Sequence, residues 1–202
     1  MLEFVLATHN KNKVREMERL LGQTLGNKVE FSVKTAEQVG VTDEIEENGS
    51  TFEENARIKA RALASDRYIS IADDSGLSVD ALGVYSARWS GEGDAGNNQK
   101  LLRELEGKRG EERRARFVTA VCCILPDGRE LMLHGECEGL ILDAPRGEGG
   151  FGYDPLFLYE PLGRSFAELS GDEKNAVSHR GRAMRALADR LAQIYIGGTV
   201  NK

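Results

Sequence analysis

The hydrophobic and polar positions along the chain follow two periods, one typical of buried strands and one typical of helices. Residues 3–8 (EFVLAT) form a short apolar run that predicts a buried strand. From Lys11 onward, apolar side chains recur at helical spacing until Gly22, which predicts a helix that ends there. The chain therefore begins with a strand, a polar turn and a helix.

The next segments repeat this alternation. Residues 29–40 predict a second strand followed by a loop. Thr51 and Glu54 match a capping box, which predicts a helix over residues 51–64. Residues 68–72 (YISIA) predict another buried strand. The predicted inward face of the helix consists of Phe52, Ala56 and Leu63.

The second half of the chain predicts a helix over 97–106, a hairpin of strands 115–125 and 129–141 turning at Pro-Asp-Gly, and a last helix over 176–195. The candidate cap of that helix is Ser178, and its predicted buried face consists of Met184, Leu187, Leu191 and Ile194. Strands that alternate with helices and then form a hairpin predict an α/β fold with a mixed sheet.

Composition narrows the class of protein. The chain has 202 residues, of which 40% are hydrophobic and 30% charged, as expected of one soluble globular domain over residues 1–202. The net charge is −6, which disfavours a general nucleic-acid binder. No apolar run is long enough to span a bilayer. From the charge we expect no nucleic-acid partner, and from the missing apolar run no membrane partner.

The three cysteines favour a reducing compartment. Cys122 and Cys123 are adjacent on a predicted strand and point to opposite faces, so they are poorly placed to pair with each other. With Cys137 the count is odd, and no Cys-x-x-Cys spacing suggests zinc. We therefore expect buried thiols and a cytoplasmic location.

Residues 8–13 (THNKNK) stand where the first strand leads into the first helix. Free backbone N–H groups and the positive end of the helix dipole favour a phosphate there, and Lys11 and Lys13 would add positive charge. The alternative is an ordinary capped helix with surface lysines, which this segment alone does not exclude.

An acidic set, consisting of Glu46, Glu47, Asp73 and Asp74, forms a second candidate site. Because side chains alternate on a strand, Asp73 should lie on the side of Ile71, and Asp74 on the opposite side. Mg²⁺ usually takes one or two protein carboxylates, which Asp74 and one of the two glutamates can supply. The alternative is that an aspartate caps the following turn, and we expect this for one of the two.

Two further polar segments follow. Residues 147–155 (GEGGFGYDP) combine glycines that let a ligand approach the backbone with Phe151 and Tyr153, whose rings could stack on a nucleobase or pack in the core. Residues 173–182 (EKNAVSHRGR) gather basic side chains at the predicted start of the last helix, where they oppose the helix dipole. Solvent exposure is the alternative explanation for this basic cluster.

Six segments, in this order, resemble the inosine triphosphate pyrophosphatase family, which hydrolyses non-standard purine nucleoside triphosphates. The segments that carry the resemblance are LATHNKNKVRE, ENGSTFEENARIKA, ADDSGLSVDALG, YSARW, GGFGYDPLF and EKNAVSHRGRA. The resemblance implies an elongated mixed sheet flanked by helices, in two lobes with a central cleft, and a homodimer. One departure is a shorter loop, since Leu82-Gly83 leads directly into Val84-Tyr85 where the family usually inserts a few residues before the segment that contains Arg88.

The resemblance also implies roles for individual residues. Asp74 corresponds to the general base, and Glu47 and Asp74 to the ligands of a Mg²⁺ ion. The residues implied to contact the triphosphate are Thr8, His9, Asn10, Lys11, Asn12 and Lys13. Those implied to contact the rest of the substrate are Ser75, Phe151, Gly152, Tyr153, Asp154, Lys174, His179 and Arg180.

The sequence thus predicts an enzyme that converts ITP, dITP or XTP to the monophosphate and pyrophosphate. Arg180 is the candidate donor to the 6-keto oxygen of the purine, because a guanidinium has no acceptor atom. The alternative is a nucleotide sensor without turnover. A sensor could bind phosphate through lysines and helix ends alone, whereas hydrolysis requires a carboxylate directed at water.

Overall fold

The computed structural model of the chain, which describes residues 1–26, 29–85 and 89–195, has an α/β fold. Its helices are α1 (Lys11–Leu25), α2 (Phe52–Ala62), α3 (Gly93–Glu104), α4 (Gly171–Val177) and α5 (His179–Tyr195). Its strands are β1 (Leu2–Leu6), β2 (Phe31–Thr35), β3 (Ile69–Val79), β4 (Gly83–Tyr85), β5 (Arg114–Ile124), β6 (Glu130–Ile141), β7 (Phe157–Tyr159) and β8 (Arg164–Ser165). Arg88 lies outside the described residues.

The sheet is mixed, as the sequence predicts. The strand order is β2-β1-β3-β5-β6-β7-β8, with β4 paired to β3. Strand β1 is parallel to both β2 and β3, whereas β3–β4, β6–β7 and β7–β8 are antiparallel. Parallel pairing near the N-terminus reflects the early alternation of strands and helices, and antiparallel pairing reflects the later short connections.

The chain divides into two compact units. Unit 1 comprises Met1–Asp74, Thr119–Gly135 and Arg180–Lys202, and unit 2 comprises Ser75–Val118 and Glu136–His179. The division falls inside β3, between Asp74 and Ser75. Each unit has its own apolar interior.

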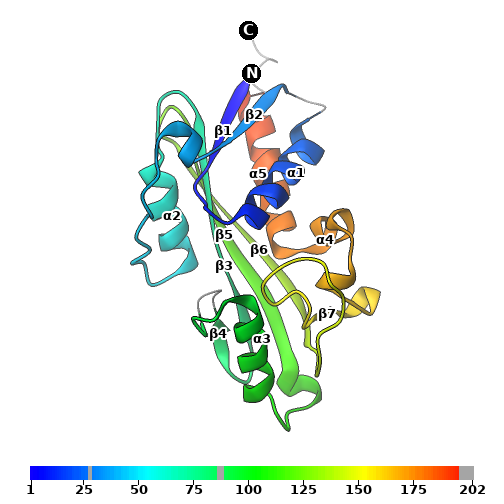
Figure 1. Cartoon of the computed structure of the whole chain (residues 1–202). Coiled ribbons are helices and arrows are strands. Elements are labelled where there is room, and N and C mark those ends of the chain that lie inside the picture. The colour runs from blue at the N-terminus through cyan, green and yellow to red at the C-terminus, as the bar shows by residue number, and fades with distance from the viewer. Residues whose placement is uncertain (27–28, 86–88, 196–202) are drawn as a thin grey trace. The chain divides into compact units, whose positions relative to one another are not determined.

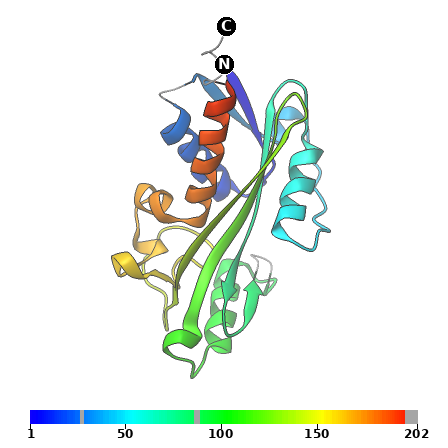
Figure 2. The same ribbon diagram turned by 180° about the vertical axis from the view of Figure 1, so that it is seen from behind.

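The strands of unit 1 carry helices on both faces (Figures 1 and 2). On one face, α1 and α5 pack against side chains such as Phe4, Ile71 and Val121. On the other face, α2 packs against alternate side chains of the same strands, such as Val5 and Ala72. The period of two along β1, β3 and β5 therefore separates two apolar layers.

The cysteines follow this alternation. Cys123 lies in the layer under α1 and α5, and Cys122 lies in the layer under α2. Cys137 is buried in unit 2, and none of these three described cysteines forms a disulfide. The predicted buried thiols are confirmed, and burial raises the pKa of the Cys122 thiol to about 12.

Unit 2 has an aromatic interior. The ring of Phe117, on β5, lies 4.6 Å from that of Phe157 and 5.7 Å from that of Phe166. Leu77 and Val79, from the second half of β3, and Leu101, from α3, are fully buried in the same cluster.

In the part of the chain that the structure describes, no helix is long and apolar enough to cross a membrane.

Besides the start of α3, which lies at Gly93 and not at residue 97, three predicted element boundaries are wrong. The strand predicted over 68–72 continues to Val79, because Leu77 and Val79 are buried. The aspartate pair therefore lies in the middle of a strand and not at its end. Helix α1 passes through Gly22 and ends at Leu25, because Leu25 packs in the core of unit 1 and stabilises one further turn.

The third error concerns the last helix, which is two helices. Ser170 and Glu173 form a capping box that begins α4, and Ser178 adopts an extended conformation that separates α4 from α5. Ser178 is the C-cap residue of α4 and directly precedes the first residue of α5, and Lys174 belongs to α4. The predicted buried face of α5 is confirmed, and Thr51 caps α2 as predicted, although the Glu54 carboxylate accepts from Ser50 and not from Thr51.

Candidate active site

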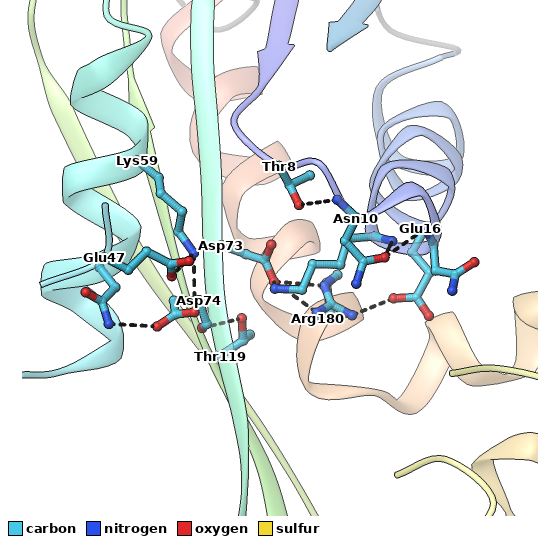
Figure 3. Close-up of polar contacts among 12 residues, drawn as sticks. Thr8, Asn10, Glu16, Glu47, Lys59, Asp73, Asp74, Thr119 and Arg180 are labelled. Atoms are coloured by element: carbon cyan, nitrogen blue, oxygen red, sulfur yellow. Dashed lines mark hydrogen bonds and ion pairs between the residues drawn. The ribbon is translucent and has the colours of Figure 1, made fainter. Parts of the chain in front are cut away.

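Asp73 and Asp74 point to opposite sides of β3 (Figure 3). Asp73 contacts residues of α1 and α5, on the side of Ile71. Asp74 contacts residues of α2, on the side of Ala72. The strand period had predicted this separation, so the two carboxylates belong to two different polar groups.

The Asp73 carboxylate is buried within a group of charged side chains in unit 1. Its Oδ2 atom lies 3.0 Å from Lys13 Nζ and accepts from Arg180 Nη2 and Nε at 2.9 and 3.2 Å. Arg180 Nη1 donates to Glu16 Oε2 at 2.6 Å. Two cations thus meet two carboxylates, which offsets the cost of burying these charges.

Burial and charge act differently on the two cations of this group. Burial lowers the pKa of Lys13, and Asp73 only partly offsets this. For Arg180, burial also favours the neutral form, but Asp73 and Glu16 outweigh it and raise the pKa. The group therefore keeps Arg180 charged and leaves Lys13, at one end of α1, as the cation with the weaker hold on its proton.

The Asp74 carboxylate is half-buried and faces α2. Its Oδ2 accepts from Asn55 Nδ2 at 3.2 Å, and its Oδ1 lies 3.3 Å from Lys59 Nζ. Thr119 donates from its hydroxyl to the backbone carbonyl of Asp74 at 3.1 Å, which fixes the strand at this position. Burial raises the pKa of Asp74 above its ordinary value despite the nearby ammonium groups of Lys59 and Lys13.

The Lys59 ammonium contacts the carboxylates of both Glu47 and Asp74. Its ammonium lies 2.7 Å from Glu47 Oε2 as well as 3.3 Å from Asp74 Oδ1. Burial would lower the pKa of Lys59, but Asp73, Asp74 and Glu47 together raise it. Glu46, by contrast, is exposed. Of the two adjacent glutamates, Glu47 is therefore the one that the fold places beside Asp74.

The Glu47 and Asp74 carboxylates suit a hard divalent cation. Both already converge on one positive group, the Lys59 ammonium, so their oxygens are directed at a point where positive charge is stabilised. Among the described residues, no group of three or more His, Cys, Asp or Glu side chains is placed to hold a metal. Two carboxylates without further protein ligands fit Mg²⁺, which keeps waters and substrate oxygens in its coordination sphere.

The start of α1 is a capped helix. Asn10 Oδ1 accepts from the backbone N–H groups of Asn12 and Lys13 at 3.0 and 3.2 Å, and Asn10 N donates to Thr8 Oγ1 at 3.2 Å. Lys11 is exposed. The segment is thus a capped helix start with Lys11 at the surface, whereas Lys13 is largely buried and reaches Asp73.

In unit 2, a buried ion pair organises the glycine-rich loop. Lys174 Nζ lies 2.6 Å from Asp154 Oδ2, and the same oxygen accepts from the backbone N–H of Phe151 at 2.8 Å. The Lys174 ammonium also lies 4.6 Å from the centre of the Phe151 ring. Asp154 and Lys174 are both nearly inaccessible to solvent, so this pair fixes the loop to α4.

The two aromatic residues of the loop have different surroundings. Tyr153 is buried in the apolar cluster of unit 2, whereas Phe151 is half-buried beside Lys174. Ser75 is half-buried on β3. Of the two rings proposed to stack on a base, Phe151 is the more accessible, and Tyr153 fits the alternative of a core aromatic.

The basic residues of 173–182 do not form one cluster. Lys174 pairs with Asp154, and the His179 ring stacks on Phe117 with centroids 4.8 Å apart. Arg180 pairs with Asp73, and Arg182 is exposed. The hypothesis that Arg180 donates to the purine must therefore account for a guanidinium that already donates to two carboxylates.

Sequence reasoning missed Lys59 and Asn55. Both contact Asp74, and both lie on α2 one helical turn apart. A signal was present, since Lys59 follows Ala56 by three residues and precedes Leu63 by four, which places a lysine next to the apolar face of the helix. A charged residue on such a face requires an opposite charge nearby.

The chain is similar to known proteins over nearly its whole length. A family model described as Ham1 family matches residues 4–190. A dITP/XTP pyrophosphatase of Bacillus anthracis is 46% identical over 98% of this chain and 100% of its own length. A dITP/XTP pyrophosphatase of Geobacter sulfurreducens is 48% identical over 95% of this chain and 97% of its own length.

A solved structure agrees with these matches. The structure of a HAM1 protein from Coxiella burnetii has a TM-score of 0.81 and 42% sequence identity, and the match covers 96% of this chain and 100% of that one. The predicted resemblance and the predicted α/β fold are therefore confirmed.

Proposed function

This chain belongs to the Ham1 family, and from that premise we propose that it hydrolyses the non-standard purine nucleoside triphosphates ITP, dITP and XTP to the monophosphate and pyrophosphate. Removal of these compounds from the nucleotide pool would be its cellular role. The observation that carries the proposal is Asp74, a half-buried carboxylate with a raised pKa beside the Lys59 ammonium. A sensor without turnover is not favoured, since the similar proteins are named as pyrophosphatases.

Asp74 is proposed as the general base. It takes a proton from water, whose oxygen forms a bond to the α-phosphorus while the bond from that phosphorus to the bridging oxygen breaks. Pyrophosphate leaves with the electron pair of that bond. A carboxylate with a raised pKa is a better base than an ordinary one, and positioned bases contribute roughly 10²–10⁴ in rate.

Glu47 and Asp74 are the residues that would hold a Mg²⁺ ion. When bound, the ion supplies positive charge that neutralises the phosphate oxygens. Lys59 holds both carboxylates in place, and its charge partly offsets the rise in the pKa of Asp74 that burial causes. Lys13, with its lowered pKa, is proposed to hold triphosphate oxygens together with the Thr8–Asn12 segment.

The nucleobase is proposed to lie against residues 151–154, with Phe151 as the stacking surface and Ser75, Lys174 and His179 as further contacts. Glycines in this loop let a flat ligand approach the backbone. We also propose that the protein acts as a homodimer in the cytoplasm.

The test is pyrophosphate release from ITP, with and without Mg²⁺, and assignment of the products by phosphorus NMR. We expect IMP and pyrophosphate as first products, and no turnover in the chelated sample. IDP and orthophosphate as first products would show cleavage at the γ-phosphate and refute the proposal. Binding of ITP without any turnover would support the sensor instead.

A further inference from the structure

Two side chains of α3 hold the backbone of one residue of the glycine-rich loop, Gly152. Asp94 Oδ2 accepts from the backbone N–H of Gly152 at 2.6 Å, and Asn98 Nδ2 donates to the carbonyl of Gly152 at 3.0 Å. Asp94 and Asn98 are four residues apart, so they lie on one face of the helix, one turn from each other. Together they engage both backbone polar groups of Gly152.

Gly152 has no side chain through which packing could fix its position. Its φ angle is +63°, in the left-handed region that glycine adopts most readily, and nothing lies within 4 Å of the position that a Cβ would occupy. Side-chain packing therefore does not hold this residue in place. The two hydrogen bonds to α3 do, and they set the direction of the chain that carries Phe151 before it and Tyr153 after it.

Asn98 is oriented by this contact. Its Oδ1 atom is buried and accepts no hydrogen bond within the part of the chain that the structure describes. A rotated amide would place that oxygen against the Gly152 carbonyl, where two acceptors would repel each other. The amide therefore directs its donor, and not its oxygen, at the Gly152 carbonyl.

The same helix holds a second segment. The buried Asn97 accepts from the backbone N–H of Ser90 at 2.7 Å. The first two turns of α3 therefore hold two segments, the residues just before the helix at Ser90 and the glycine-rich loop at Gly152. The two hydrogen bonds from this helix to the loop are those that Asp94 and Asn98 form with Gly152.

We propose that Asp94 and Asn98 are positioning residues that set nucleobase selectivity by holding the backbone N–H and carbonyl of Gly152. This inference rests on the proposed function, because it takes residues 151–154 as the nucleobase surface. Both residues act through the loop and leave the hydrolysis at Asp74 untouched. Their loss should therefore impair the distinction between bases more than it impairs the reaction.

The variants are Asp94→Ala, Asn98→Ala and the double variant, with Gln99→Ala as a matched control because Gln99 is exposed on the same helix. For each we would measure kcat and KM for ITP and ATP, the thermal midpoint, and inhibition by tripolyphosphate, which has no base. We expect the ratio of kcat/KM for ITP over ATP to fall about tenfold in the double variant, as for the loss of two ordinary hydrogen bonds. The kcat for ITP and inhibition by tripolyphosphate should stay within about twofold of wild type.

Two nearly isosteric exchanges separate this role from general support of the fold. Asp94→Asn keeps an acceptor for Gly152 N–H and should retain the wild-type ratio. Asn98→Asp removes the donor and faces the Gly152 carbonyl with a carboxylate, so it should lower the ratio at least as much as Asn98→Ala. An unchanged ratio in the double variant, or equal losses of kcat for both substrates, would overturn the proposal.

The result also separates this inference from the proposed function. If the wild-type protein does not hydrolyse ITP, the proposed function fails, and calorimetric binding of ITP and ATP then decides the role of α3. A loss of preference for ITP in the double variant would support it. Equal preference in wild type and variant would refute it.

Discussion

The candidate residues of unit 1 and those of unit 2 are held in place by different means. In unit 1, charged side chains on β3, α1, α2 and α5 fix one another, as Asp73 with Arg180 and Asp74 with Lys59 (Figure 3). In unit 2, the backbone of a glycine-rich loop is fixed by its hydrogen bonds with the side chains of Asp94, Asn98 and Asp154. Substitutions in unit 1 should therefore act mainly through charge, and those in unit 2 mainly through backbone conformation.

The largest effect is expected for Asp74→Asn. Asparagine is nearly isosteric and still accepts from Asn55, but it cannot take a proton from water. We expect kcat for ITP to fall by about 10²–10⁴, the usual contribution of a general base, with an unchanged thermal midpoint. Pyrophosphate release and calorimetry check this. Near-wild-type activity would remove Asp74 as the base, and a collapsed midpoint would make it a structural residue.

Asp73→Asn should instead act on stability. This substitution removes the charged carboxylate that Lys13 and Arg180 share, and the Arg180 guanidinium is buried. Removal of one partner from a buried ion pair typically costs about 3–5 kcal/mol of unfolding free energy. Urea denaturation measures this cost. A loss below 1 kcal/mol, together with a large loss of activity, would show that Asp73 acts on the reaction directly.

Glu47→Gln and Glu46→Gln compare adjacent glutamates in one loop. Glu47 is held by Lys59 beside Asp74, whereas Glu46 is exposed. We expect Glu47→Gln to raise the Mg²⁺ concentration for half-maximal activity about 10- to 100-fold, the scale typical of a damaged metal site. Glu46→Gln serves as the control and should change nothing. Equal responses of the two variants would contradict the assignment of Glu47.

The periodicity of the sequence predicted those features of the site that lie within a single strand or helix. The alternation along β3 placed Asp73 and Asp74 on opposite sides, and the apolar layers of unit 1 followed from the same period. The end of β3 was not predictable in this way, because its continuation depends on the burial of Leu77 and Val79 in unit 2. Local polarity alone suggested a strand end at the aspartates.

Contacts between distant segments escaped the sequence. Arg180 and Asp73 are 107 residues apart, and Asp94 and Gly152 are 58 residues apart. Helical spacing could show that Lys59 lies beside an apolar face, but it could not name Glu47 and Asp74 as its partners. The charged residues of 173–182 likewise looked like one cluster, and only the break at Ser178 separates Lys174 from Arg180.

The smallest effects are expected from two glycines of the loop, Gly150→Ala and Gly152→Ala. Both residues have positive φ, +71° and +63°, so either alanine costs strain in the range of about 1–3 kcal/mol of unfolding free energy. A Cβ at Gly150 would also press on the Asp154 carboxylate, whereas a Cβ at Gly152 meets open space. We therefore expect Gly150→Ala near the upper end of this range and Gly152→Ala near the lower.

Activity should separate the two glycine variants further. The collision at Gly150 displaces the Asp154 carboxylate, which accepts from Phe151 N–H and pairs with Lys174, so the variant should raise KM for ITP. Gly152→Ala leaves Asp154 in place, and the backbone of residue 152 keeps its hydrogen bonds with Asp94 and Asn98. Denaturation and steady-state kinetics with ITP test both expectations. If the two variants lose stability and affinity equally, strain at positive φ alone determines the loop, and the Asp154–Lys174 pair has no part in shaping it.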